Sequence, residues 1–153
     1  MRSRRIATTA VTALVATGLV AVATTNPATA AGPGPQPVTS WLDAVPAEER
    51  SWVSIYWTTG RKICDGAVTV TGEDVRIGYP ENTGTYTSFS QSAKLRPGRL
   101  DYTAFTVRPR AGAEQFRQVE ATLSYNTCGR HAVEKAQTFR LTFAVLPAPA
   151  AKK

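Results

Sequence analysis

Very few side chains in this sequence could perform catalysis. His131 is the only histidine among the 153 residues, and it lies shortly after Cys128, with Glu134 nearby. A catalytic triad needs a histidine held between a nucleophile and a carboxylate, and the sequence contains no G-x-S-x-G elbow to supply that nucleophile. We therefore expect His131 to lie exposed in a turn, and we predict no catalytic residue.

Metal and cofactor chemistry have equally little support. Zinc sites use three or four protein ligands, which one histidine and two mutually bonded cysteines cannot provide. No glycine-rich phosphate loop is followed by a helix, so we predict neither a metal site nor a cofactor. Paired carboxylates could hydrolyse a glycoside, but most of the candidates fall in turns or at outward strand positions. These candidates are Asp65, Glu73, Asp74, Asp101 and Glu120.

The two cysteines, Cys64 and Cys128, permit a single intramolecular disulfide. A bridge that closes a loop of about 64 residues stabilises a fold by roughly 4 kcal/mol in the chain-entropy model. Such a bond requires an oxidising compartment. The expectation of a structural disulfide therefore depends on export of the chain.

The N-terminus has the pattern of a secretory signal peptide. Three arginines stand within the first five residues, residues 6–25 carry no charge, and Ala-Thr-Ala follows at 28–30. Small residues at these last positions suit a signal peptidase, which predicts cleavage between Ala30 and Ala31. The mature protein is expected to be secreted.

The same segment also bears on the export route and on membrane anchoring. Arg4 and Arg5 could form a twin-arginine signal, but Ala7 stands where a bulky apolar residue is expected, so the Sec route is favoured over Tat. A stretch of about 20 apolar residues would span a bilayer. Six threonines dilute residues 6–25, and we predict no stable membrane anchor.

Removing the leader also lowers the positive charge. The mature chain keeps fifteen basic and eleven acidic residues, a net charge of +4, which does not indicate a nucleic-acid partner. Basic residues at 94–99 and 108–110 flank a candidate strand at 100–107, which separates them by roughly 26 Å. This separation exceeds two Debye lengths, so we interpret them as solvated loop charges.

Alternating apolar and polar residues predict a chain of β-strands. The alternation is clear at 118–126, 138–145, 64–70 and 75–79, and weaker at 52–58, 85–90 and 100–107. About seven short strands without an amphipathic helix indicate a single all-β, antiparallel β-sandwich. The predicted organisation is a signal peptide at 1–30, a flexible Pro/Gly-rich segment at 31–49 with a helical turn after Pro46, the sandwich at 50–147 and a disordered tail at 148–153.

The strand lengths and the distant cysteine pair over residues 52–146 resemble an immunoglobulin-like domain. The resemblance implies a disulfide that joins the two sheets, although Tyr125 lies three residues before Cys128 instead of two. Alternation at 119–125 places odd residues in the core, so Cys128 is out of phase. We expect the strand to end by Asn126, which places the bridge at the rim of the sandwich.

Aromatic residues provide the remaining candidates for binding. Trp52 and Tyr56 share one face of the strand at 52–58, and the alternate residues share the other. If the alternate residues face the core, Trp52 and Tyr56 stand outward about 13 Å apart and could contact a sugar chain. The favoured alternative is that the segment around Trp41 covers them. Tyr86, in a turn-rich connection, is a further candidate.

These observations predict an exported, non-catalytic binding module whose partner is a glycan or an extracellular protein. The alternative function is a protease inhibitor that presents Lys94 or Arg96 from the loop at 91–99. Tight inhibitors present a pre-organised loop, and we expect no neighbouring disulfide to make this loop rigid. A secreted hydrolase is the least favoured function.

Overall fold

The computed structural model describes residues 34–112 and 115–148. These residues form ten strands and no helix, so the fold is all-β, as predicted. Within these ranges no helix is long and apolar enough to cross a membrane. The predicted signal peptide, its cleavage site at Ala30–Ala31 and residues 149–153 of the predicted tail at 148–153 lie outside the described residues.

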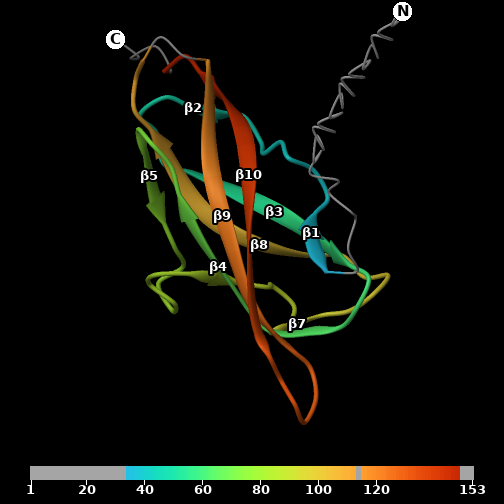
Figure 1. Ribbon diagram of the computed structural model, residues 1–153. Coiled ribbons are helices and arrows are strands. Elements are labelled where there is room, and N and C mark those ends of the chain that lie inside the picture. Colours follow the sequence, from blue (N-terminus) through green and yellow to red (C-terminus); the bar gives the residue numbers. More distant parts are fainter. Residues whose placement is uncertain (1–33, 113–114, 149–153) are drawn as a thin grey trace, which may run out of the picture. The chain divides into compact units, whose positions relative to one another are not determined.

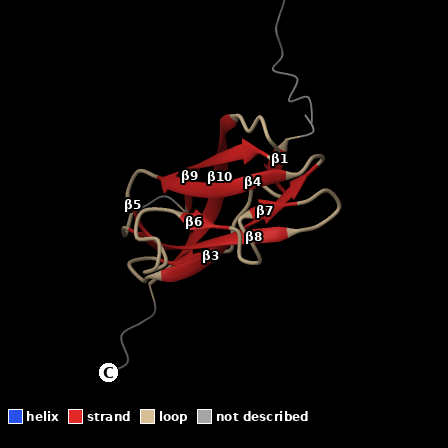
Figure 2. Cartoon of the chain, turned by 90° about the horizontal axis from the view of Figure 1, so that it is seen from below, coloured by secondary structure: helices blue, strands red, loops and turns tan. Residues whose placement is uncertain are grey.

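Two sheets make up the structure, and Figure 2 shows them as separate layers. The four-stranded sheet is entirely antiparallel, and strands distant in the sequence are neighbours in it. Its spatial order is β1 (Pro35–Pro37), β3 (Ser51–Thr59), β8 (Asp101–Pro109) and β5 (Val75–Gly78).

The six-stranded sheet contains the long β9–β10 hairpin that is visible in Figure 1. The short strand β2 runs parallel to β10 at one edge, and the other pairs are antiparallel. The order is β2 (Val45–Pro46), β10 (Glu134–Leu146), β9 (Phe116–Thr127), β4 (Ile63–Thr71) and β6 (Thr87–Ser88), with β7 (Lys94–Leu95) also paired to β4.

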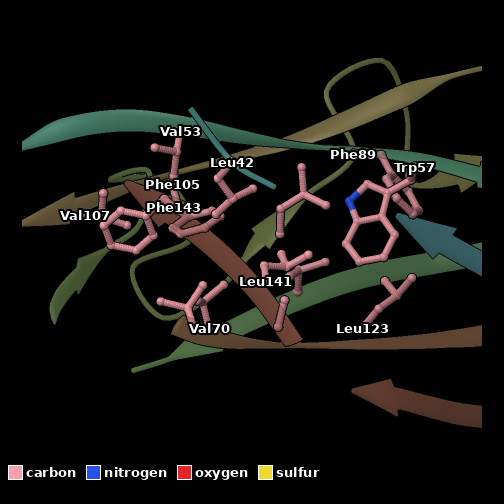
Figure 3. Packing of buried hydrophobic residues seen from close by; sticks show 14 of the residues in the cluster. Leu42, Val53, Trp57, Val70, Phe89, Phe105, Val107, Leu123, Leu141 and Phe143 are labelled. Atoms are coloured by element: carbon pink, nitrogen blue, oxygen red, sulfur yellow. The ribbon is translucent and has the colours of Figure 1, made fainter. Parts of the chain in front are cut away.

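The core lies between the two sheets, because each long strand directs alternate side chains inward. Figure 3 shows side chains from both sheets meeting there. The four-stranded sheet contributes Val53, Ile55, Trp57, Phe105 and Val107, and the other sheet contributes Val68, Val70, Val119, Leu123, Leu141 and Phe143. The predicted alternation at 119–125 is confirmed, since Val119, Ala121, Leu123 and Tyr125 are all buried.

The prediction of a flexible segment at 31–49 is wrong for the described residues 34–49. Strands β1 and β2 lie here, and Leu42, Val45 and Ala47 are buried, so the sandwich begins well before residue 50. The prolines of β1 are tolerated because β1 is an edge strand, where missing amide donors break no ladder.

The predicted helical turn after Pro46 does not form either. The Ala47 amide donates to the Leu146 carbonyl at 2.9 Å, and the Glu48 amide donates to the Pro109 carbonyl at 2.8 Å. Long-range partners therefore satisfy the amides that a helical turn would have left for capping. Burial of Val45 and Ala47 favours this arrangement over a local helix.

Cys64 and Cys128 form the predicted disulfide, with their Cα atoms 5.3 Å apart. Cys64 lies near the start of β4, and Cys128 follows the last residue of β9, so the bridge lies at the rim. Since β4 and β9 are neighbours in one sheet, the bridge does not join the two sheets as the immunoglobulin resemblance implied. A disulfide is compatible with an oxidising compartment.

The pairing of β4 with β9 contains a register shift, a β-bulge that lies on β4 between Cys64 and Ala67. Gly66 within this bulge packs against Phe89, and a Cβ atom there would come within 2.2 Å of the Phe89 ring. Strand β9 itself remains regular and ends at Thr127, one residue beyond the predicted limit.

Candidate functional site

The outer surface of the four-stranded sheet exposes aromatic side chains. Trp52 and Tyr56 on β3 are 61% and 50% exposed, because Val53, Ile55 and Trp57 occupy the inward positions of the same strand. Tyr102 on β8 is 38% exposed and lies opposite Tyr56 in the register. We call Trp52, Tyr56 and Tyr102 the aromatic face.

Two features give the aromatic face a defined geometry. The rings of Tyr56 and Tyr102 are 5.8 Å apart, with their planes inclined by 46°. Between this pair and Trp52, the register places Ser54 opposite Ala104, both of them small. Trp52 lies four residues from Tyr56, or about 13 Å along an extended strand. The result is a low floor with aromatic rings at both ends.

The favoured expectation that the Trp41 segment covers Trp52 and Tyr56 is wrong. Trp41 bridges to Thr142 on β10 of the other sheet, and its ring packs edge-on against Phe116 at 5.8 Å. The Leu42 amide donates to the Thr142 carbonyl, which fixes the segment along that edge. Trp52 and Tyr56 therefore stay open to solvent.

Arginines gather at the Trp52 end of this surface. Arg76 on β5 lies directly opposite Arg108 on β8. Together with Arg50, which precedes β3, they line a shallow depression whose other walls include Gly78 and Thr106. We call Arg50, Arg76 and Arg108 the arginine cluster.

The cluster borders a second depression of about 350 Å³, which Arg76 and Arg108 line together with Arg110 and Glu48. Arg110 is engaged by Asp74 at 3.7 Å. Arg108 is held by the Glu48 carbonyl, to which its Nε donates at 2.7 Å. The side chains of Arg50 and Arg76 form no ion pair or hydrogen bond with any other described residue. Arginine predominates at this end of the sheet.

The other predicted positions are dispersed. Tyr86 is exposed on the loop before β6, whose partner is β4 of the other sheet, so it does not belong to the aromatic face. His131 is exposed in the turn between β9 and β10, where the sequence placed it. No group of three or more potential metal ligands occurs in the described parts of the chain.

Three of the candidate carboxylates line one open concavity of about 950 Å³ on the six-stranded sheet: Glu73, Asp74 and Glu120. Two of these side chains are engaged by arginines, Asp74 by Arg110 at 3.7 Å and Glu120 by Arg140 at 3.2 Å. Both remain more than half exposed, whereas the acid of a glycosidase is typically buried. The arrangement offers little support for a catalytic pair.

The loop at 91–99 is more firmly attached than the sequence indicated. Lys94 pairs with Cys64 in the sheet, directly beside the disulfide, and Leu95 is buried. The Lys94 amide donates to Ser92 Oγ, and this hydroxyl donates back to the Lys94 carbonyl. The expectation that no disulfide neighbours this loop is therefore wrong.

Sequence reasoning identified two of the three aromatic residues and missed the arginine cluster. Tyr102 alternates with buried residues on β8, so its exposure could have been expected from the pattern. The approach of Arg50, Arg76 and Arg108 had no such signal, because it depends on the pairing of β3, β8 and β5.

The sequence matches no protein-family model and no curated protein. Among solved structures, one similar chain comes from the structure described as "AvmM Catalyzes Macrocyclization in Alchivemycin A Biosynthesis". It is 10% identical, with a TM-score of 0.39, and the alignment covers 76% of this chain and 89% of the other.

Proposed function

We propose that this protein is an exported, non-catalytic binding module that holds a glycan against the aromatic face. The observation that carries the proposal is the exposure of Trp52, Tyr56 and Tyr102 on one sheet surface. Large aromatic side chains normally bury most of their area. Three of them on one open surface favour a ligand that covers them.

The geometry favours a sugar chain over a globular protein. The aromatic face lies on strands that pair regularly, and its rings flank a floor of small residues. Rigid strands hold such rings in fixed positions, so an elongated ligand can contact both ends without reordering the site. A protein interface more often has a compact hydrophobic core surrounded by a polar rim.

The cellular setting belongs to the same proposal. Residues 1–30 would direct export, most readily by the Sec route, and the mature protein would act outside the cell. An immunoglobulin-like classification stays a prediction that rests on strand number and length, and the disulfide within one sheet departs from that type.

The test is to measure glycan binding with Trp52→Ala and with Trp41→Ala as its matched control. Both residues are exposed tryptophans, at 61% and 55%, but they lie on different sheets. We expect Trp52→Ala to weaken binding about tenfold or more, as for a central aromatic contact, and Trp41→Ala to leave it unchanged. Equal effects of both substitutions, or no retention of the wild type on any glycan of a broad panel, would refute the proposal.

The protease inhibitor remains a second candidate, because β7 fixes Lys94 beside the disulfide and so provides the rigidity that an inhibitor needs. Against it, the neighbouring Leu95 is 1% exposed and could not enter a protease cleft together with Lys94. Incubation with trypsin separates the cases. Stoichiometric inhibition that Lys94→Ala abolishes would establish the inhibitor, and cleavage without inhibition would eliminate it.

A further inference from the structure

We infer that the glycan is acidic, and that the arginine cluster binds its carboxylate groups while the aromatic face contacts its sugar rings. This inference rests on the proposed function, since it assigns a ligand class to the same surface.

Arg76 and Arg108 are direct cross-strand partners on an exposed surface. Like charges at such positions repel each other and destabilise the sheet. Arg50 lines the same depression and adds a third positive charge. An anion between these guanidinium groups would relieve the repulsion, so the unliganded sheet is already arranged for one.

Arg108 is also oriented for binding. Its Nε donates to the Glu48 carbonyl at 2.7 Å, which holds the guanidinium group beside the second depression, the one that Arg76, Arg108 and Arg110 line. This hydrogen bond uses one of the five N–H donors of the side chain, and the terminal nitrogens can still bind a carboxylate with two parallel hydrogen bonds. Glu48 is the one acidic residue among those that line this depression.

The arginine cluster and the aromatic face form a continuous surface. Trp52 is opposite Thr106, which is opposite Gly78, and Thr106 and Gly78 both line the depression of the cluster. A side chain at Gly78 would collide with Thr106, since a Cβ atom would lie 2.5 Å from the Thr106 hydroxyl oxygen. Because Gly78 has no side chain, no group projects from that position on the surface between Trp52 and Arg76.

Distances along β3 match an elongated ligand better than a small anion. Arg50 precedes Trp52 by two residues and Tyr56 by six, so the three positions extend over about 20 Å of extended strand. A free carboxylate or phosphate would occupy only the cluster. A polysaccharide with acidic groups can contact the arginines and the aromatic rings at the same time.

The experiment measures binding of the full chain to polygalacturonate, alginate and hyaluronate, each beside its carboxyl-reduced, neutral counterpart. We expect at least one acidic polymer to bind at least tenfold more tightly than its reduced form, and its affinity to fall as salt rises. Arg76→Gln and Arg108→Gln should each weaken binding of the acidic polymer about fivefold to tenfold and leave binding of its reduced form unchanged. Arg130→Gln, an equal charge change at an exposed turn on the other sheet, is the matched control.

A second measurement does not depend on affinity. If the arginines repel each other, Arg76→Gln should raise the Tm of the unliganded protein, and the preferred acidic polymer should raise the Tm of the wild type more than that of the variant. A Tm that falls in unliganded Arg76→Gln would contradict the repulsion on which the inference depends.

The outcomes distinguish this inference from the proposed function. Binding of acidic and reduced polymers with equal strength, lost in Trp52→Ala, would overturn the acidic ligand and retain the glycan module. Binding to inorganic polyphosphate or RNA as tight as to the acidic polymers, and unaffected by Trp52→Ala, would indicate nonspecific electrostatic binding. That outcome would overturn both the acidic ligand and the glycan module. Retention on none of the six polymers overturns the acidic ligand, and the broad panel then decides the glycan module separately.

Discussion

Two tryptophans on β3, five residues apart, have opposite environments. Trp52 is 61% exposed, whereas Trp57 is fully buried, because an odd separation places them on different faces of the strand. The indole Nε1 of Trp57 donates to Thr103 Oγ1 at 2.9 Å, and its ring packs against Phe139. A polar atom in the core is thus satisfied by one hydroxyl group.

Replacing that hydroxyl should be costly. Thr103→Val leaves the Trp57 N–H without its acceptor, and an unsatisfied buried donor costs about 1–3 kcal/mol of unfolding free energy. Urea denaturation measures the loss. Thr122→Val is the control, because its hydroxyl pairs with Thr138 on an outer surface and should matter by less than about 0.5 kcal/mol. Equal stability of the two variants would contradict the prediction.

At the scale of elements, a single carboxylate organises the connection that leads to the aromatic face. Asp101 at the start of β8 is 5% exposed and accepts hydrogen bonds from the Ser90 amide and hydroxyl and from the Gln91 amide. It also accepts from the amide of Tyr102. This buried acid, one of the carboxylates considered for catalysis, therefore has a structural role.

Removing it should loosen the loop without unfolding the sandwich. Asp101→Ala removes the acceptor of the Gln91 and Tyr102 amides and of the Ser90 hydroxyl. We expect a loss of roughly 1–3 kcal/mol, with faster hydrogen exchange at Gln91. Asp101→Asn keeps one acceptor oxygen and should lose less. Glu120→Ala is the control, since its exposed ion pair with Arg140 contributes about 0–1 kcal/mol. Unchanged exchange at Gln91 in Asp101→Ala would refute this role.

At the scale of the whole molecule, the disulfide and the aromatic face belong to different sheets. The bridge ties the start of β4 to the end of β9 in the six-stranded sheet, and it closes a chain segment 64 residues long. The aromatic face lies on β3 and β8. Loss of the bridge should therefore act through the stability of the fold and not through the binding surface.

A variant with both Cys64→Ser and Cys128→Ser should lose about 4 kcal/mol of unfolding free energy, because the reduced chain gains entropy when it unfolds. Comparison of denaturation curves measures this loss. Under conditions where the variant remains folded, its glycan affinity should match that of the wild type. A stability change below about 1 kcal/mol, or a selective loss of affinity in the folded variant, would contradict the separation of roles.

The sequence alone determined seven of the ten described strands, how their residues divide between two faces, and the disulfide. Alternation at 119–125 and at 52–58 is a local property, because successive side chains of a strand point to opposite faces whatever the strand pairs with. The same rule allowed Trp52 and Tyr56 to be recognised as one set. Two cysteines leave a single intramolecular pairing, so the bridge needed no structure either.

Only the tertiary structure decided which strands are neighbours, and with it the candidate site. The segment around Trp41 joined the six-stranded sheet, which exposed Trp52 and Tyr56, and pairing of β5 with β8 brought Arg76 beside Arg108. These contacts link residues far apart in the chain, and local alternation carries no information about partner or register. The sandwich could therefore be expected from the residues, whereas the arginine cluster could not.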